Sequence, residues 1–163
     1  MSKTLLLKQE PTSVLRVVVF GPESTGKTTL CKDLAAHYKT LWVPEFARVF
    51  LQDKWDKKKE GCTREDLITI AQGQMRAENA ALSKANKILF CDTNVLVTEI
   101  WSETHFDGYC DPIIKEAAKQ VCYDLYLLTG IDVPWEGDDL RDRPNDRGLM
   151  FKFFENRLKT QKF

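Results

Sequence analysis

One stretch limits the possible fold more than any other: residues 17–30, with the sequence VVVFGPESTGKTTL. An apolar, β-branched run precedes a turn that fits the pattern G-x-x-x-x-G-K-[ST] from Gly21 to Thr28, and an amphipathic helix pattern follows. The two glycines let the backbone curl, so that successive N–H groups point inward at an anion. The helix that begins near Lys27 adds the positive end of its dipole. The stretch therefore predicts a strand, a phosphate-binding loop and a helix. The alternative, an ordinary glycine turn, is disfavoured by this flanking context.

The residues of the loop have distinct expected roles. Lys27 is expected to reach the β- and γ-phosphates of ATP, and the Thr28 hydroxyl to ligate Mg²⁺. The other loop residues expected around the phosphates are Gly21, Glu23, Ser24, Thr25, Gly26 and Thr29. The loop predicts ATP and Mg²⁺ as ligands, but it does not define the reaction.

Length and charge narrow the class of protein. The chain has 163 residues, which suit one domain, and we expect a loosely held leader over residues 1–13 followed by a single domain over residues 14–163. The 24 basic and 24 acidic residues balance, so no overall field draws the chain to nucleic acid or to an anionic membrane. No apolar run approaches the length of a membrane span. The five cysteines are odd in number and form no C-x-x-C pair, which indicates reduced thiols in a cytoplasmic protein without a zinc site.

Apolar strand patterns alternate with helix patterns along the chain. Strands are expected at about 14–20, 41–43, 87–91 and 123–128, and helices at about 27–38, 46–59, 63–86, 94–101, 112–121 and 146–159, with a loop over residues 102–109. This order predicts an α/β fold: a P-loop kinase-like, doubly wound parallel sheet with helices on both faces. The sheet has four or five strands, because a fifth would follow the final helix, where the sequence stops. In the long helix the polar residues are expected mostly to face solvent, with one or two reaching a substrate: Gln72, Gln74, Arg76, Glu78 and Asn79.

Two acids follow predicted strands. Glu45 comes after residues 41–43, with Arg48 one helical turn later, and Asp92 comes after residues 87–91. Ligands of open α/β sheets bind at the carboxyl ends of strands. Glu45 is therefore either a substrate-side carboxylate or a helix N-terminal acid, and local sequence does not decide between them. For Asp92 the phosphate loop favours a role toward Mg²⁺ or the attacking hydroxyl over a plain helix cap.

Residues of about 131–147 are dense in Arg and Asp. One interpretation is a solvated loop whose charges pair with each other at little net gain. In a phosphoryl-transfer enzyme the same segment would be a lid whose arginines neutralise transition-state charge and which excludes water. Near a strand's carboxyl end, Trp101, Phe106 and Tyr109 are core residues or walls of a base-binding slot, and residue type alone favours the core.

Four segments in this order resemble a known family: Gly21–Thr28, Val43–Arg48, Cys91–Asn94 and Asp138–Arg147. The chain is similar, from about Val14 to Phe154, to the ribosylnicotinamide kinase domain of bifunctional bacterial NAD-salvage proteins and to related stand-alone P-loop proteins. The phosphate loop is generic, whereas the P-E-x-x-R segment and the Arg-rich segment are specific. The resemblance implies ATP-dependent phosphorylation of nicotinamide riboside at its 5′-hydroxyl, giving nicotinamide mononucleotide.

By matching motif, the resemblance implies a set of site residues. The catalytic residues would be Lys27, Asp92, Glu45, Arg141 and Arg143. Besides the loop, Arg143 and Arg147 would bind ATP, and Thr28 and Asp92 would hold Mg²⁺. The acceptor would contact Glu45, Arg48, Asn94, Trp101 and Trp135, the two tryptophans as walls for the nicotinamide ring.

Two alternatives stay open. One is a kinase for a (deoxy)nucleoside or another small molecule. The other is a nucleotide-sensing module without turnover, which an absent fifth strand supports and the Arg-rich segment opposes. An adenylyltransferase activity is not expected, because the sequence has no H-x-G-H-like segment. The expected partners are a small nucleoside and ATP, with no nucleic acid and no membrane, and nothing indicates a homo-oligomer.

Overall fold

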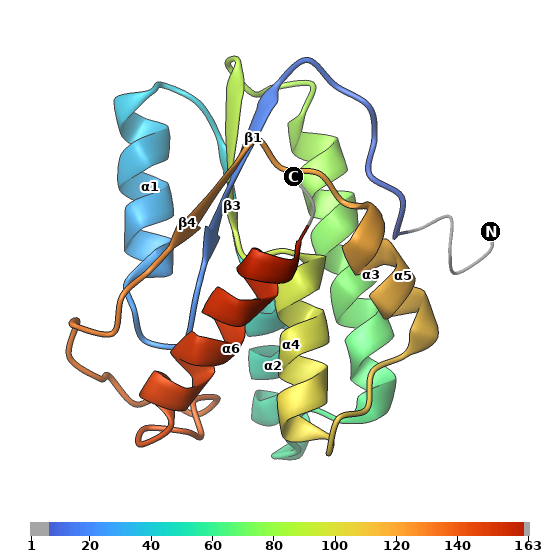
Figure 1. The fold of residues 1–163 in the computed structure, drawn as a ribbon, viewed down its shortest axis with the longest axis vertical. Coiled ribbons are helices and arrows are strands. Elements are labelled where there is room, and N and C mark those ends of the chain that lie inside the picture. The colour runs from blue at the N-terminus through green and yellow to red at the C-terminus, as the bar shows by residue number, and fades with distance from the viewer. Residues whose placement is uncertain (1–6, 162–163) are drawn as a thin grey trace.

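The computed structural model describes residues 7–161, which form a four-stranded sheet between two layers of helices (Figure 1). The elements in chain order are β1 (Leu15–Phe20), α1 (Lys27–His37), β2 (Trp42–Val43), α2 (Phe46–Lys58), α3 (Arg64–Ala81), β3 (Ile88–Asp92), α4 (Val95–His105), α5 (Pro112–Gln120), β4 (Leu125–Leu128) and α6 (Arg147–Thr160). The predicted α/β class and the helices on both faces are confirmed.

The sheet has the strand order β2-β3-β1-β4, and all of its pairs are parallel. β1 lies in the interior, where Val18 is level with Cys91 of β3 and with Tyr126 of β4. A parallel strand covered on both faces is apolar along its whole length, which explains the unbroken run of valines. Within residues 7–161 there is no fifth strand, so the described sheet has four.

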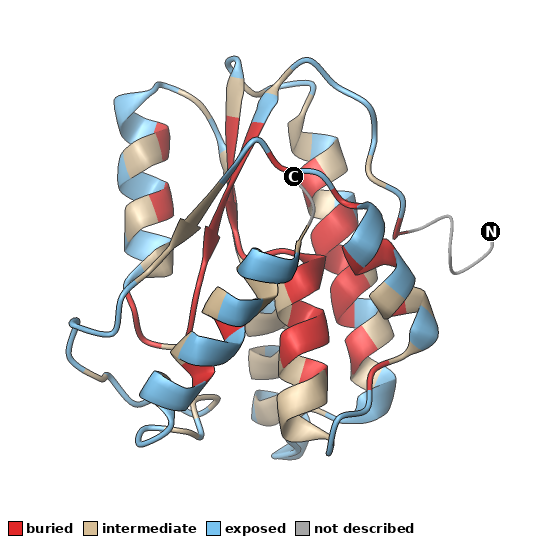
Figure 2. Ribbon diagram, in the orientation of Figure 1, coloured by how far each residue is buried: buried red, intermediate tan, exposed pale blue. Residues whose placement is uncertain are grey.

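Each face of the sheet carries its own core. The smaller core, on the side of α1, contains Val17, Val19, Cys31, Ala35 and Phe90. The larger one unites the other face with α3, α4, α5 and α6, and Phe20 of β1 there meets Phe154 of α6 edge to face at 4.8 Å. Figure 2 shows the buried residues gathered on the central strands and on the inner sides of α3, α4 and α5.

The predicted loop over residues 102–109 is wrong in its first part, because α4 continues to His105. Two of its polar side chains donate to backbone carbonyls: Thr104 Oγ1 to Ile100 O within the helix at 2.9 Å, and the buried Ser102 Oγ to Tyr109 O beyond the helix end at 2.6 Å. Two other bounds also differ, since α3 ends at Ala81 and β4 begins at Leu125.

Residues 7–10 are tied to the domain, in contrast to the expected loose leader. Leu7 is 3% exposed within the larger core. The backbone N–H of Glu10 donates to Asn79 Oδ1 of α3 at 2.9 Å, and Asn79 Nδ2 donates to Lys8 O at the same distance. Residues 1–6 of the predicted leader lie outside the described residues, and the boundary at residue 14 stays a prediction. No described helix is both long and apolar enough to cross a membrane.

Candidate functional site

All four strands end at one edge of the sheet, the lower edge in Figure 1, where a cavity of about 310 Å³ opens. Its walls come from the β1–α1 loop, the start of α2, the inner faces of α3 and α4, the segment between β4 and α6, and α6 itself. We call residues 131–146, which contain no helix or strand, the lid segment.

The β1–α1 loop depends on two glycines. Gly21 has φ 148°, and a Cβ there would lie 2.4 Å from Thr129 Oγ1, while Gly26 has φ 79°. Thr25 Oγ1 donates to Pro22 O at 2.8 Å and lies 2.6 Å from Thr129 Oγ1, which fixes the loop against the end of β4. The first N–H groups of α1 have no partner within the helix and face the loop, so this turn is an anion-binding site by construction.

Lys27 lies across the mouth of this loop. Its Nζ donates to Pro22 O at 2.6 Å. Burial lowers the pKa of Lys27, while the nearby carboxylates of Glu45, Asp92 and Glu23 raise it. The ammonium is thereby held over the loop, where phosphate oxygens of a nucleotide would lie.

Thr28 and Asp92 meet beneath the loop. Thr28 Oγ1 donates to Asp92 Oδ2 at 2.5 Å. Asp92 is 1% exposed, and burial raises its pKa, although the hydrogen bond from Thr28 and the charge of Lys27 lower it. Its other oxygen, Oδ1, is buried without a hydrogen-bond partner among the described residues. An orphaned carboxylate oxygen beside a hydroxyl fits a hard cation such as Mg²⁺, whose other ligands are waters and phosphates. The described residues hold no cluster of three or more His, Cys, Asp or Glu side chains for a metal cage made of protein alone.

The start of α2 places Glu45 and Arg48 opposite the loop. Arg48 Nε lies 3.9 Å from Glu45 Oε2, and its Nη1 lies 2.5 Å from Asp138 of the lid segment. Burial raises the pKa of Glu45 in spite of the nearby Lys27. Both side chains line the cavity.

Helix α3 fixes the position of α2. The backbone N–H of Phe46 donates to Gln74 Oε1 at 2.9 Å. A Cβ at Gly73 would lie 2.3 Å from the Phe46 ring, so the two helices meet at a position without a side chain. Gln74 is 3% exposed and lines the cavity, and Glu78 is fully buried. The expected solvent face is therefore wrong for Glu78, whereas contact of Gln74 with a substrate stays a prediction.

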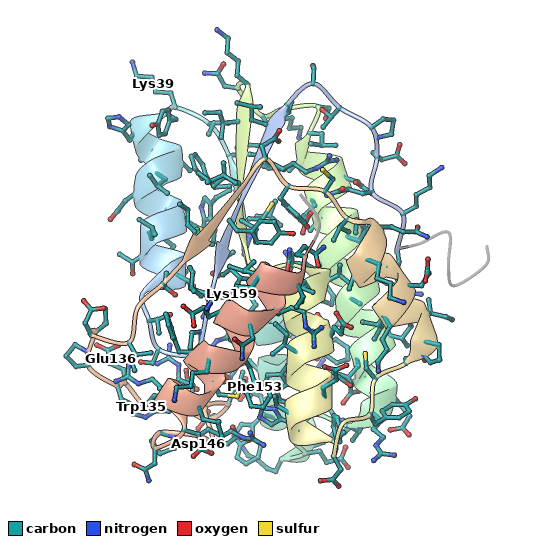
Figure 3. The ribbon with its side chains drawn as sticks, in the orientation of Figure 1. Lys39, Trp135, Glu136, Asp146, Phe153 and Lys159 are labelled. Carbon is teal, nitrogen blue, oxygen red and sulfur yellow. The ribbon has the colours of Figure 1, made fainter. Side chains whose placement is uncertain are left out.

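The lid segment is fastened on three sides. Toward the loop, the N–H of Glu136 donates to Ser24 Oγ at 2.8 Å. Arg147, the first residue of α6, joins the two through its Nη1, which donates to Ser24 O at 3.1 Å and to Val133 O at 2.6 Å. Toward α4, Arg143 Nη2 donates to Thr104 O at 2.8 Å. Toward α2, the ion pair between Arg48 and Asp138 joins the lid segment to the helix. Figure 3 shows Trp135 and Glu136 in this segment near Asp146, which precedes α6.

The aromatic residues divide between cavity and scaffold. Trp101 lines the cavity and stacks on His105, with ring centroids 3.8 Å apart and planes 13° apart. Trp135 lines it from the lid segment, with the Arg147 guanidinium 5.7 Å from its ring centroid. Phe106 instead packs edge-on against Trp101, and Tyr109 is 40% exposed outside the lining.

The structure thus gathers most of the predicted site residues around one cavity. The lining contains Gly21, Glu23, Ser24, Thr25, Gly26, Lys27, Thr28, Thr29, Glu45, Arg48, Trp101, Trp135, Arg141, Arg143 and Arg147. Asp92 adjoins it through Thr28. Asn94 is outside the lining, and its Oδ1 accepts from the N–H of Val97 at 3.2 Å as the cap of α4. The individual roles of these residues stay predictions.

Several lining residues were not predicted. His105 was assigned to a loop, and burial together with Arg143 lowers its pKa, while Asp142, 3.4 Å from its Nε2, raises it. The apolar wall comes from residues whose pattern marks them as core: Leu51, Leu67, Ile70, Val97, Met150 and Phe154. Helical periodicity cannot separate a residue that faces a cavity from one that faces another side chain.

The parallel sheet and its glycine-rich turn define an α/β P-loop domain. Residues 16–163 match the model of the AAA_28 family, described as an AAA domain, and the chain belongs to that family.

Among characterised proteins, the chain is similar to the trifunctional NAD biosynthesis/regulator protein NadR. It is 27% identical to NadR of Escherichia coli K12 over 152 residues, which are 90% of this chain and 37% of that protein. It is 28% identical to NadR of Salmonella typhimurium LT2 over 132 residues, which are 81% of this chain and 32% of that protein. The chain therefore spans about a third of the length of these relatives. The predicted resemblance to NAD-salvage proteins is confirmed.

Two solved structures share the fold. A NadR protein in complex with NR superposes with a TM-score of 0.75 at 22% identity, over 90% of this chain and 43% of that one. A NadR protein in complex with NAD and AMP-PNP superposes with a TM-score of 0.71 at 22% identity, over 90% and 41%. At this identity the likeness shows the fold.

Proposed function

We propose that this chain is an ATP-dependent kinase that phosphorylates nicotinamide riboside at its 5′-hydroxyl, giving nicotinamide mononucleotide, in the cytoplasm. The observation that carries the proposal is the shared cavity: the phosphate loop with Lys27 and Thr28 and the strand-end acid Glu45 open into the same space. A kinase needs donor and acceptor side by side in this way, because its catalysis is mostly positioning and charge neutralisation.

The donor half consists of the loop, α1 and the arginines of the lid segment and α6. Lys27 would contact the β- and γ-phosphates, and Arg141, Arg143 and Arg147 would neutralise charge that develops during transfer. The pair of Thr28 and Asp92 would hold Mg²⁺, which would supply positive charge against the negative charge of the phosphates. The lid segment excludes water from the cavity, which limits wasteful hydrolysis of ATP.

The acceptor half lies between α2, α3 and α4. Glu45 lines the cavity, whereas Asp92 is 1% exposed and already bonded to Thr28. This difference supports Glu45 as the group that accepts the hydroxyl proton and Asp92 as the metal-side acid. A pKa raised by burial makes Glu45 a better base than an exposed carboxylate. Trp101 would form a wall for the nicotinamide ring, with Trp135 near the mouth.

The homology supports the same acceptor. The relatives carry NAD biosynthesis in their name, and one solved NadR structure contains NR. Because the chain spans about a third of those proteins, this remains a proposal for the present chain.

The test is an ADP-release assay with a panel of acceptors that includes nicotinamide riboside and several deoxynucleosides. The proposal expects ADP release stimulated by nicotinamide riboside and the appearance of its monophosphate. Stimulation by a deoxynucleoside alone would assign another acceptor to the same kinase. ATP binding with no phosphorylated product from any acceptor would instead indicate a nucleotide-sensing module.

A further inference from the structure

Glu23 is an acid in the middle of a phosphate-binding loop. A carboxylate close to a triphosphate is repelled by it, since like charges disfavour each other most where water is partly excluded. The residue is therefore poorly suited to binding the donor.

The protein does not use the Glu23 carboxylate to build the loop. Ser24, Thr25 and Lys27 each make a side-chain hydrogen bond within the protein. Among residues 7–161 the Glu23 carboxylate has neither a hydrogen bond nor an ion pair within 4.0 Å, although its side chain is half-buried in the cavity lining. The carboxylate is therefore open to the cavity and free to accept hydrogen bonds from a ligand.

The charged surroundings of Glu23 come from both halves of the proposed site. The charged groups that act on its carboxylate are Asp142 of the lid segment, Arg48 and Glu45 at the start of α2, and Lys27. Most of these are engaged elsewhere: Asp142 with His105, Arg48 with Asp138 and Lys27 with Pro22. Glu23 thus lies on the phosphate loop and lines the same cavity as Glu45 and Arg48 at the start of α2, where the acceptor is expected.

We propose that Glu23 is a specificity-determining residue that accepts hydrogen bonds from hydroxyl groups of the phosphoryl acceptor, and thereby selects ribosyl compounds with adjacent free hydroxyls. A carboxylate has two oxygens and no proton to donate, so it matches two neighbouring hydroxyl donors. This inference rests on the proposed function. Glu45 would accept the proton of the hydroxyl that reacts, and Glu23 would bind hydroxyls that do not react.

Burial and the nearby Asp142 raise the pKa of Glu23 to about 7. Hydroxyl donors stabilise the ionised form and would lower that pKa in the complex. The KM for the acceptor is therefore expected to fall as the pH rises through about 7, and this pH dependence is expected to disappear when Glu23 is replaced.

The experiment is a double-mutant cycle in which one change is made in the protein and the other in the substrate. Wild type, Glu23→Ala and Glu23→Gln are assayed with nicotinamide riboside and with its 2′-deoxy and 3′-deoxy analogues, at saturating ATP. Glu23→Ala is expected to raise the KM for nicotinamide riboside about 10-fold or more, the size expected for a hydrogen bond to a charged group. Glu23→Gln is expected to have a smaller effect. With wild type, kcat/KM for at least one deoxy analogue should be about 10-fold lower than for nicotinamide riboside. With Glu23→Ala, that analogue and nicotinamide riboside should have the same kcat/KM. Asp33→Asn, which removes one exposed acid from α1, is the charge-matched control.

Each other outcome is decisive. Equal losses for the deoxy analogues in wild type and Glu23→Ala would overturn the assignment. So would weaker binding of a non-hydrolysable ATP analogue to Glu23→Ala with an unchanged acceptor KM, because Glu23 would then serve the donor. If wild type does not use nicotinamide riboside, the proposed function fails separately, and the cycle is run with the acceptor that the panel identifies. If no acceptor on the panel is phosphorylated, the proposed function and the assignment of Glu23 both fail.

Discussion

Glu78 lies fully buried on α3, away from the candidate site, and its titration should make the stability of this protein depend on pH. Tyr123 donates its hydroxyl to Glu78 Oε2 at 2.7 Å. Burial raises the pKa of Glu78 from 4.5 to about 7, although the Tyr123 hydrogen bond and the charge of Arg16 oppose the rise. The folded protein therefore holds this proton more tightly than the unfolded chain does.

The sign and size follow from that difference. The stabilisation is fully present below pH 4.5 and is lost as the pH rises through about 7. With these two pKa values, the contribution of Glu78 to the free energy of unfolding falls by about 2 kcal/mol between about pH 5.5 and about pH 8.5. Glu78→Gln keeps the shape and an acceptor for Tyr123 but cannot titrate, so this loss should be absent from the variant.

The measurement is urea unfolding of wild type and Glu78→Gln at a series of pH values across this range. The free energy of unfolding of the variant minus that of wild type should rise by about 2 kcal/mol from the acid to the alkaline end. Other titrating groups cancel in this difference. A difference that stays constant with pH would refute the argument, because Glu78 would then not change its protonation within the range. Tyr123→Phe provides a check on direction: loss of the hydrogen bond should raise the pKa of Glu78 further and move the loss of stability to higher pH.

Three further predictions concern the site. Lys27→Ala should reduce kcat by about 10³-fold or more while thermal unfolding stays within a few degrees of wild type; near-normal turnover would remove Lys27 from the phosphate contacts. Asp92→Asn should lower kcat far more than it weakens binding of an ATP analogue, and its activity should require more Mg²⁺; an unchanged kcat would reduce Asp92 to a structural residue. Gly73→Ala places a methyl group against the Phe46 ring and should cost about 1–3 kcal/mol of stability and raise the acceptor KM. Phe46→Leu in the same chain should restore part of both, and an additive effect of the two changes would contradict this contact.

The arrangement of the sheet could be predicted from sequence because its signals are local. The valine run, the glycine turn and the strand-end acids each lie within a few residues, and parallel strands bring their carboxyl ends to one edge. That rule suffices to place Glu45 and Asp92 near Lys27 before any coordinates are known.

What could not be predicted depends on contacts between distant segments. Ser102 and Thr104 resemble loop residues until their hydroxyls are seen to donate to backbone carbonyls, Thr104 to Ile100 within α4 and Ser102 to Tyr109 beyond its end. Gln74 looks like a solvent-facing helix residue, yet it is 3% exposed because α2 packs over it. Asn94 follows the strand-end pattern, but the need to cap α4 turns its side chain away from the cavity. In each case tertiary packing overrides a correct local tendency.

The strand order has a consequence for how the chain folds. β1 pairs through Val18 with Cys91 on one side and with Tyr126 on the other, so neither pairing is local in the sequence. A ribosome delivers the phosphate loop before β3 and β4, so β1 must wait for β3 and then for β4 before its apolar residues are covered. Such long-range parallel pairings form slowly and leave apolar strands exposed meanwhile. Because β3 also brings Asp92, the proposed metal-binding part of the site is completed only at this later step, and nascent chains that end before β3 should not retain nucleotide.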